Sequence, residues 1–430
     1  MYIKPLNLLP GALSKPTPVP VNQPGSLISG KVMKWLGGQM ATVNIGGQLY
    51  TAKVDGDLKA GDRYVFQVMT GDDSSVLHLK LVASHENPKT PLSNQLFKQL
   101  GIAANARNQD LLNYMIQKGV PLSPSSVKEW LALTESVPQM KDAMAILDEM
   151  FARELPLNPV IFQAIGAVKR GPGATFLLEK LEDLLQTYTN NSGSEKGPEL
   201  NAIKQLITEI LQQGESVQSP FSSGVALSQL FEKMGLFHEA MIAQFLPHSG
   251  GNEDPTLPPQ TLKGELITLL GLGDKLPNGL TQTASHLLHH ITGEQLLSLT
   301  HDPNWFCLNA QIPIQLPNEK KTGAKVKWEI KKAPDGSLDP AFCRLLFHVY
   351  LTNLKETILQ MVIQDRYVSC TLYTEGKMSI DPLASTVYDD MKQRLQELSF
   401  NLVGFYHRKE SLHEIKKQFV SRASQMDVTI

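Results

Sequence analysis

The residues from Trp305 to His407 alternate between apolar and polar side chains with a period of two. This period is typical of strands that bury one face, because successive side chains of a strand point to opposite faces of the sheet. Five successive segments share it: Leu308–Leu316, Ala324–Lys332, Cys343–Leu351, Thr357–Gln364 and Tyr367–Thr374. A helix over 382–398 and a strand over 400–407 close the unit. We therefore predict a multidomain α+β chain whose C-terminal domain, residues 305–408, is a sandwich-like α/β unit with a mixed or antiparallel sheet, followed by a tail over 409–430.

A second strand-rich region precedes it, at residues 26–84. Short alternating segments are separated there by Gly37-Gly38, Gly46-Gly47 and Asp55-Gly56, which are residue types that tight turns require. Strands of this length and spacing predict a small β-barrel of OB-like or SH3-like type. Residues 1–25 are rich in proline, which predicts an extended leader before the barrel.

The barrel region has some features of a nucleic-acid-binding surface, but acidic residues are mixed with them. OB-like barrels bind single strands through basic residues and stacking aromatic rings. Residues of both kinds are present: Trp35, Tyr50, Tyr64 and Phe66 with Lys31, Lys34, Lys53, Lys59 and Arg63. Acidic residues in the same region reduce the local positive charge: Asp55, Asp57, Asp62, Asp72 and Asp73. We favour a packing or protein-contact role for the barrel, and single-stranded nucleic-acid binding is the alternative.

Residues 90–300 change to the period of helices. Apolar positions recur every three or four residues, and the helices end at glycines such as Gly101 and Gly119. Ser123-Pro124 supplies capping chemistry for one of them. A polar linker at 190–198 can divide this helical region into two halves. No heptad seam is long enough for a coiled coil.

Bulk properties exclude several classes of protein. At 430 residues the chain is too long for one ordinary core, so we expect several domains. The formal net charge of −2 gives no overall reason to expect nucleic acid or an acidic membrane as a partner. No apolar run approaches the ~18 residues that cross a bilayer, so we expect no integral membrane segment. Pro5 and Pro10 interrupt the apolar N-terminus, so no signal-peptide core forms and we expect a cytoplasmic protein.

The three cysteines, Cys307, Cys343 and Cys370, are an odd number without C-x-x-C spacing. Two of them lie in apolar strand patterns. We therefore expect small buried side chains in a reducing compartment, with neither disulfides nor metal.

Residue patterns for catalysis are missing from the sequence. His286 and His290 are four residues apart and so share a helix face, but no glutamate stands between them as an H-E-x-x-H zinc site requires. The glycines at 171–173 are not followed by the Lys-Ser pair of a phosphate loop, and no G-x-S-x-G elbow occurs. We predict a protein that is not an enzyme, with no cofactor, no metal and no small-molecule substrate.

The last third of the chain resembles the C-terminal domain of the flagellar hook-length control protein family, with the nearest likeness to hook-length-control-like proteins of Bacillus-type bacteria. The resemblance is carried by WFCLNAQIPIQL, by the segment from VKWEIKKAPDG to DRYVSCTLY, and by the helix and strand that end in FNLVGFYH. The upstream HHITGEQLLSL and the final MDVTI add to it.

The resemblance implies a partner. In that family the C-terminal domain contacts the export-gate switch protein of the flagellar type III secretion apparatus, and the contact changes export from rod and hook subunits to filament subunits. The family's N-terminal part is exported as a length ruler, and rulers are long, polar and poor in regular structure. Residues 26–300 here have the patterns of folded domains, so the resemblance implies the switch-type contact rather than a ruler, in a cytoplasmic protein that can be exported through a flagellar-type apparatus.

A switch-type contact would use apolar residues of the predicted sheet or an edge strand that pairs with a partner strand. The candidates by pattern are Leu354, Val362, Ile363, Val368, Leu372 and Tyr373.

Overall fold

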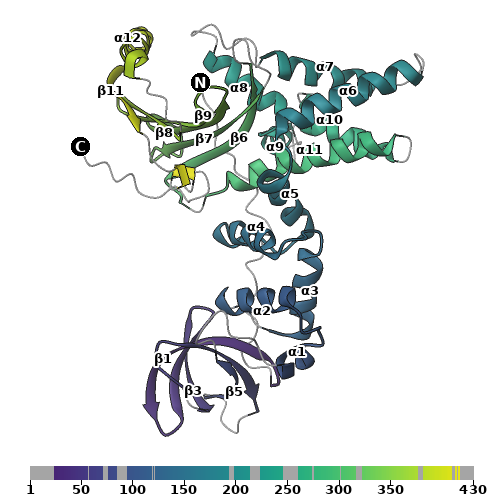
Figure 1. Cartoon of the computed structure of the whole chain (residues 1–430), viewed down its shortest axis with the longest axis vertical. Helices are drawn as coiled ribbons and strands as arrows, with labels where there is room; N and C mark the ends of the chain where they lie inside the picture. Colours follow the sequence, from purple (N-terminus) through teal and green to yellow (C-terminus); the bar gives the residue numbers. More distant parts are fainter. Residues whose placement is uncertain are drawn as a thin grey trace, which may run out of the picture. The chain divides into compact units, whose positions relative to one another are not determined.

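The structure is a computed structural model that describes residues 24–56, 58–70, 76–84, 94–118, 120, 122–192, 198–213, 223–245, 260–273, 276–300, 302–315, 322–375, 381–408, 412–413 and 415–416. The predicted leader lies outside these residues as far as position 23, and most of the predicted tail also lies outside them. The chain divides into two compact units between Asp148 and Glu149, within α4 (Met140–Ala152). We call residues 14–148 the barrel unit and the chain from Glu149 onward the sheet unit (Figure 1).

The barrel unit begins with five strands that close into a barrel in the order β1-β2-β3-β5-β4. Their bounds are β1 (Leu27–Gly37), β2 (Met40–Ile45), β3 (Gln48–Asp55), β4 (Arg63–Met69) and β5 (Leu77–Ser84). β3 and β5 run parallel, and the other neighbouring strands are antiparallel. The predicted small barrel is confirmed, and its strand order is that of an OB-like barrel.

The barrel core is filled by alternate residues of the strands, including Val32, Val43, Ala52 and Phe66. Glycine is needed at position 30, where a Cβ atom would lie 2.5 Å from Cγ1 of Val43. This close approach lets β1 and β2 curve into a closed barrel.

Hydrogen bonds join the helical part of the barrel unit to β1. Their bounds are α1 (Asn94–Leu100), α2 (Ala106–Lys118), α3 (Pro124–Thr134) and the first residues of α4. The N–H of Leu122 donates to the carbonyl of Leu27 (2.7 Å), and the hydroxyl of Ser29 donates to the carbonyl of Ile116 (2.9 Å). The predicted cap of α3 is confirmed, because Oγ of Ser123 accepts from the N–H of Ser126.

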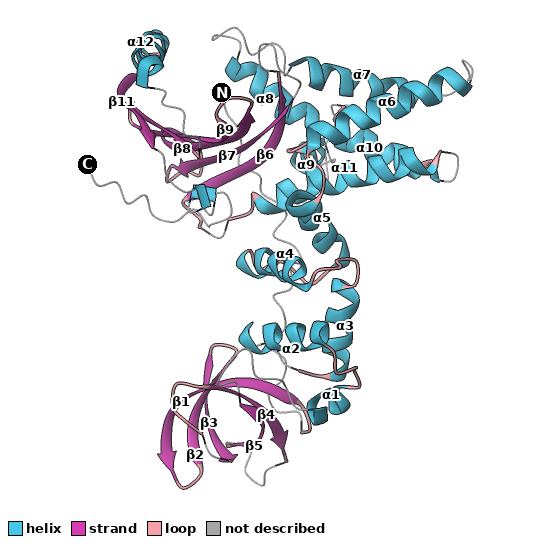
Figure 2. Cartoon of the chain, in the orientation of Figure 1, coloured by secondary structure: helices cyan, strands magenta, loops and turns pink. Residues whose placement is uncertain are grey.

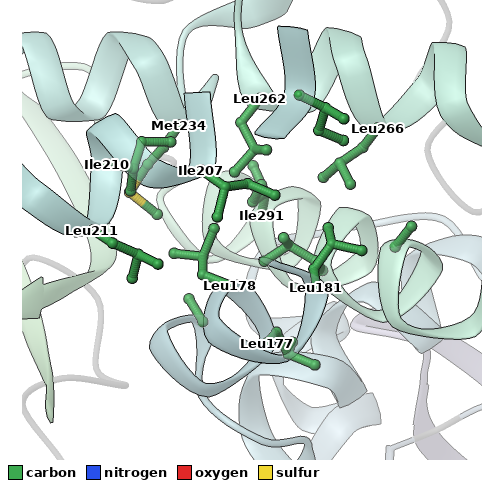
Figure 3. Packing of buried hydrophobic residues seen from close by; sticks show 14 of the residues in the cluster. Leu177, Leu178, Leu181, Ile207, Ile210, Leu211, Met234, Leu262, Leu266 and Ile291 are labelled. Carbon is green, nitrogen blue, oxygen red and sulfur yellow. The ribbon is translucent and has the colours of Figure 1, made fainter. Parts of the chain in front are cut away.

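The sheet unit contains α5 (Pro159–Arg170), α6 (Ala174–Ser192), α7 (Pro198–Gln213), α8 (Ser223–Met234), α9 (His238–Phe245), α10 (Leu262–Gly271) and α11 (Asn278–Leu297). Figure 3 shows Leu, Ile and Met side chains of α6, α7, α8, α10 and α11 that point toward one another. Helices α6 and α7, on either side of residues 193–197, pack against each other in this core. A Cβ on Gly293 of α11 would lie 2.1 Å from the carbonyl oxygen of Ala164, so α5 and α11 cross with backbones in close contact.

Six strands form one sheet in the order β11-β10-β9-β8-β7-β6 (Figure 2). Their bounds are β6 (Trp305–Ile314), β7 (Thr322–Lys332), β8 (Leu338–Leu351), β9 (Lys355–Gln364), β10 (Tyr367–Thr374) and β11 (Asn401–Arg408), with α12 (Asp381–Glu397) before β11. β10 and β11 are parallel and the other pairs are antiparallel. The predicted mixed sheet is confirmed.

One face of this sheet is apolar along its whole width. At the β6 side it packs on the helices, and Leu308, Ala310 and Val326 belong to the same core as the residues of Figure 3. At the β11 side α12 covers Val368, Cys370 and Leu402. No helix in the described part of the chain is long and apolar enough to cross a membrane.

The cysteines are all buried, as predicted, and each of them is a free thiol. Burial raises the pKa of the Cys307 and Cys370 thiols to about 11 and also raises the pKa of Cys343. At pH 8 the reactive thiolates are therefore scarce as well as inaccessible. We expect iodoacetamide to modify none of the three in the folded protein and all three in urea, as counted by mass spectrometry. Alkylation of a cysteine in the folded protein at the rate of a free thiol would contradict this.

Candidate functional site

The outer surface of β1, β2 and β3 is the candidate binding site of the barrel, because OB barrels bind oligonucleotides on the face of their second and third strands and through adjoining loops. We define it as the outer face: Lys31, Lys34, Met40, Thr42, Asn44, Leu49, Thr51 and Lys53. Their neighbours along each strand, such as Val43 and Ala52, point into the core. The period of two therefore places all eight side chains outside the barrel.

The pairing of β1, β2 and β3 places the three lysines of the outer face close to one another. Lys31 is paired with Asn44, Lys34 with Thr42, and Lys53 with Met40. All three lysines are exposed, and none of the eight residues of the outer face is acidic. Asp55 follows Lys53 by two positions on β3 and so points to the same side of the barrel, where it is paired with Lys80, and Asp62 precedes β4. Three positive charges thus lie close together, with one negative charge, that of Asp55, beside Lys53.

Only part of the predicted aromatic set is available for stacking. Tyr64 and Phe66 are core residues, with 2% and 0% exposure, because both point inward on β4, so neither ring can stack on a base. Tyr50 is half-buried against the same core and its hydroxyl donates to Oε1 of Gln48 (2.7 Å). Trp35 is 39% exposed. Among the predicted rings, Trp35 is the one whose surface is open to a base.

Trp35 is exposed because the pairing of β1 with β2 is irregular on both sides of it. Register shifts lie between Val32 and Lys34 and between Trp35 and Gly37. Such bulges interrupt the inward–outward alternation and re-aim side chains. Met33, Lys34, Trp35 and Leu36 are consequently all exposed along this end of β1. Because Trp35 is paired with Ala41, a core residue, its exposed ring lies on the opposite side of β1 from Lys34 and the outer face.

The other predicted basic residues have different positions. Arg63 begins β4, and its guanidinium donates to the carbonyl of Ile116 (3.4 Å), so it joins the barrel to the helices of its unit. Lys59 is exposed before β4, where its backbone N–H donates to the Tyr64 hydroxyl (2.8 Å). Asp57, Asp72 and Asp73 lie outside the described residues.

The six residues predicted to contact a partner lie on β9, β10 and the turn before β9. Ile363 and Val368 are paired across the two strands, and Leu372 shares their face. Val362 and Tyr373 lie on the opposite face, and Leu354 lies in the turn. None of the six is exposed. Their assignment to a partner surface stays a prediction.

An open strand edge lies beside those residues and was not singled out from the sequence. β11 pairs with β10, and no other described strand pairs with it. Val403 and Tyr406 of β11 are 60% and 51% exposed. The opposite edge, β6, is in contact with α6, α7 and α11. The alternation in FNLVGFYH indicated a strand, but only the sheet order shows that this strand is at an edge.

The histidine pair does not assemble a metal site in the described part of the chain. His286 is exposed, whereas His290 is buried and its Nδ1 lies 3.6 Å from Oε1 of Glu294. Burial lowers the pKa of His290 to about 4, so its ring is neutral at physiological pH. Among the described residues no group of three or more His, Cys, Asp or Glu side chains could hold a metal ion.

Comparison with known proteins gives one match to the barrel and one to the whole chain. The profile of the TP0910 S1-like domain family matches residues 7–78, which include β1 to β4 and the start of β5. The barrel is similar to an S1-like domain. Over the whole chain, the uncharacterized protein YlqG of Bacillus subtilis (strain 168) is 20% identical across an alignment of 548 residues that covers 94% of this chain and 93% of YlqG. Neither description refers to flagellar export, so the resemblance of the C-terminal domain stays a prediction.

Proposed function

We propose that the S1-like barrel binds single-stranded nucleic acid across β1, β2 and β3. The observation that carries this proposal is the outer face, where three exposed lysines lie together and outnumber the neighbouring carboxylate of Asp55. Lysines of this kind neutralise backbone phosphates, and the exposed ring of Trp35, on the other side of β1, offers a stacking surface to a base. The match to an S1-like domain supports the same role. The net charge of −2 for the whole chain does not oppose it, because binding depends on the local field.

The test is a titration of the full chain into a labelled single-stranded oligonucleotide of about 12 residues, which is within the range that one OB barrel covers. Fluorescence anisotropy would report binding between about 50 and 200 mM salt. Three phosphate contacts predict that log K falls with log salt with a slope of about −2. A duplex of the same sequence serves as the control and is expected to bind more weakly. Absence of binding at the lowest salt concentration would refute the proposal.

A second role is favoured by the open edge of the sheet unit. We propose that β11 pairs with a strand of a protein partner, because its outer N–H and C=O groups are unpaired by any described strand and Val403 and Tyr406 are exposed beside them. The partner that the resemblance implies is the cytoplasmic domain of an export-gate switch protein of flagellar type. This would place the protein in the cytoplasm. Both roles are binding roles, and we propose no catalytic activity.

Lysine at the edge is expected to block this contact. In the double variant Val403→Lys, Tyr406→Lys, capture of the full chain on an immobilised export-gate cytoplasmic domain should fall about tenfold or more, because charged edge residues oppose strand pairing. Tyr350→Lys replaces an equally exposed ring on β8 and should leave capture unchanged. If the unmodified chain is not captured, or if the double variant is captured equally well, β11 is not the docking edge.

A further inference from the structure

A pocket of about 100 Å³ lies in the sheet unit, where the turn between α8 and α9 and the end of α11 meet the start of β6. We call it the aromatic pocket, because three rings contribute to its wall: Phe237, Trp305 and Phe306. A polar pocket beside α5 and α11 is lined by Glu149, Lys169, Glu294, Gln311 and Lys325. No described residue lines both pockets. The aromatic pocket also belongs to neither the outer face of the barrel nor β11.

The packing of the sheet unit holds the wall of the aromatic pocket in place. Leu236 and Leu308 of the wall are core residues, and Phe237 and Phe306 pack against the same core. Core side chains have little freedom to move, so these two rings have fixed positions. Phe237, Trp305 and Phe306 are each half-buried, and part of each ring is therefore available to a ligand. An apolar cavity of roughly 150 Å³ binds benzene, and this smaller pocket, which is open on one side, can accept most of one ring.

Gln295 of the wall has no hydrogen-bonding capacity left for a ligand. Its Nε2 donates to the carbonyl of Leu236 (3.0 Å) and to Oε2 of Glu239 (2.7 Å). Its Oε1 accepts from Nζ of Lys263, which is also paired with Glu239. The amide group of Gln295 thus stabilises the turn between α8 and α9 and does not present itself to the pocket.

The two hydroxyl groups of the wall are also engaged. Oγ of Ser298 donates to the carbonyl of Glu294 (2.7 Å) and accepts from the backbone N–H of Asn309 (2.7 Å). Oγ1 of Thr300 accepts from the backbone N–H of Asp302 (3.2 Å). A ligand whose polar groups need neutral hydrogen-bond partners would therefore lose its water without replacement.

Lys332 is the one charged residue among the described residues that line the aromatic pocket. It ends β7, and its backbone N–H donates to the carbonyl of Asn304 (2.7 Å), which fixes it beside the start of β6. Its half-buried side chain has no hydrogen bond or ion pair with a described residue. Asp302, in the turn before β6, instead accepts from the backbone N–H of Asn304 (2.9 Å). The pocket thus combines an apolar, aromatic wall with one cation whose charge is not neutralised by a partner.

We infer that the aromatic pocket binds a small aromatic carboxylate. The ring of the ligand contacts Phe237, Trp305 and Phe306, because aromatic rings pack favourably edge to face or offset. Its carboxylate lies toward the opening and pairs with the ammonium group of Lys332 through a charge-assisted hydrogen bond. A cation of the same shape would be repelled, and a neutral amide would gain no ion pair. This small-molecule role is independent of both binding roles proposed above.

The test compares phenylacetate, phenylacetamide and phenethylamine as ligands of the full chain by isothermal titration calorimetry. The three share one ring and differ in the charge of the polar group. Phenylacetate should bind about tenfold more tightly than phenylacetamide, because it alone forms the ion pair with Lys332. Phenethylamine and acetate, which lack the anion and the ring respectively, should bind most weakly. Equal affinities for phenylacetate and phenylacetamide, or no binding of phenylacetate at about 10 mM, would overturn the inference.

Two matched lysine variants assign the selectivity to Lys332. Lys332→Met keeps the hydrocarbon stem and removes the charge, so the ratio of the two Kd values, phenylacetamide over phenylacetate, should fall to about one. Lys325→Met makes the same change at an exposed lysine of β7 that does not line the aromatic pocket, and it should leave the ratio near ten. An unchanged ratio in Lys332→Met, or an equal fall in both variants, would overturn the assignment.

Tryptophan fluorescence locates the ligand independently of charge. Phenylacetate should change the emission of the unmodified chain, because Trp305 lines the aromatic pocket. Trp305→Phe keeps a ring at this position, so calorimetric binding should persist while most of the emission change is lost. An undiminished emission change in Trp305→Phe would place the ligand elsewhere and contradict the inference.

Discussion

The triple variant Lys31→Glu, Lys34→Glu, Lys53→Glu is expected to weaken binding of a single-stranded oligonucleotide by about two orders of magnitude or more at 50 mM salt. Each lysine is exposed on the outer face and can neutralise one phosphate. Its replacement removes that contact and adds a repulsion. The slope of log K against log salt should also move from about −2 toward zero, because fewer counterions are released. Fluorescence anisotropy of the full chain measures both quantities.

A matched control separates the outer face from the overall charge. The variant Lys128→Glu, Lys141→Glu, Lys180→Glu changes three lysines that are equally exposed but lie on helices. It alters the net charge by the same amount and is expected to bind nearly as tightly as the unmodified protein. Equal losses in both triple variants would mean that binding depends on net charge alone. No loss in the outer-face variant would mean that nucleic acid does not bind there.

The largest expected effect on stability comes from Glu329→Ala, which should lower the free energy of unfolding of the sheet unit by about 3–5 kcal/mol. Glu329 on β7 is 2% exposed and forms ion pairs with two cationic side chains. Nζ of Lys327 lies 2.9 Å from its Oε1, and Nε of Arg344 lies 2.6 Å from its Oε2. Lys327 is equally buried, so the substitution removes its carboxylate and leaves its ammonium group away from water.

Hydrogen exchange measures this loss within the sheet unit. Amides of β6, β7 and β8 should exchange about two to three orders of magnitude faster in Glu329→Ala, since each 1.4 kcal/mol is a factor of ten. The double variant Lys327→Met, Glu329→Leu removes both buried charges together and should restore most of the protection. Arg344 has a partly exposed side chain that reaches water. Unchanged exchange in the single variant would show that the buried pair does not stabilise the sheet.

Sequence periodicity predicted the strands of the sheet well because each strand has one fully apolar face. The predicted segments Thr357–Gln364 and Tyr367–Thr374 coincide with β9 and β10 to within two residues. β8 begins at Leu338, five residues before the predicted Cys343, because Leu338 and Asp339 pair with β7 beyond a register shift. The irregular pairing hides this extension from a simple count of alternating residues.

The closure of the barrel could not be predicted from local patterns. The choice between an OB-like and an SH3-like barrel depends on the parallel pairing of β3 with β5, two strands that are distant along the chain. The same limit applies to the aromatic residues. Tyr64 and Phe66 stand two positions apart on β4, and alternation alone does not say which face of a strand is the inner one.

The pocket beside α5 and α11 had no local signal in the sequence. Glu149, Lys169, Glu294, Gln311 and Lys325 come from five separate elements, and each is an ordinary charged or polar residue in its own segment. Only the packing of α5 and α11 beside β6 and β7 brings them together. The lysines of the outer face, in contrast, lie within two adjacent hairpins and could be named from the sequence.

Photocrosslinking tests the nucleic-acid proposal most directly, because it shows where a bound strand lies. A single-stranded oligonucleotide with photoreactive uridines would be bound to the full chain, irradiated, and its attachment sites identified by mass spectrometry. We expect crosslinks in the peptides of β1, β2 and β3, with Trp35 as a principal site, and their loss in the outer-face variant. Crosslinks confined to the sheet unit, or an unchanged yield in that variant, would contradict the account.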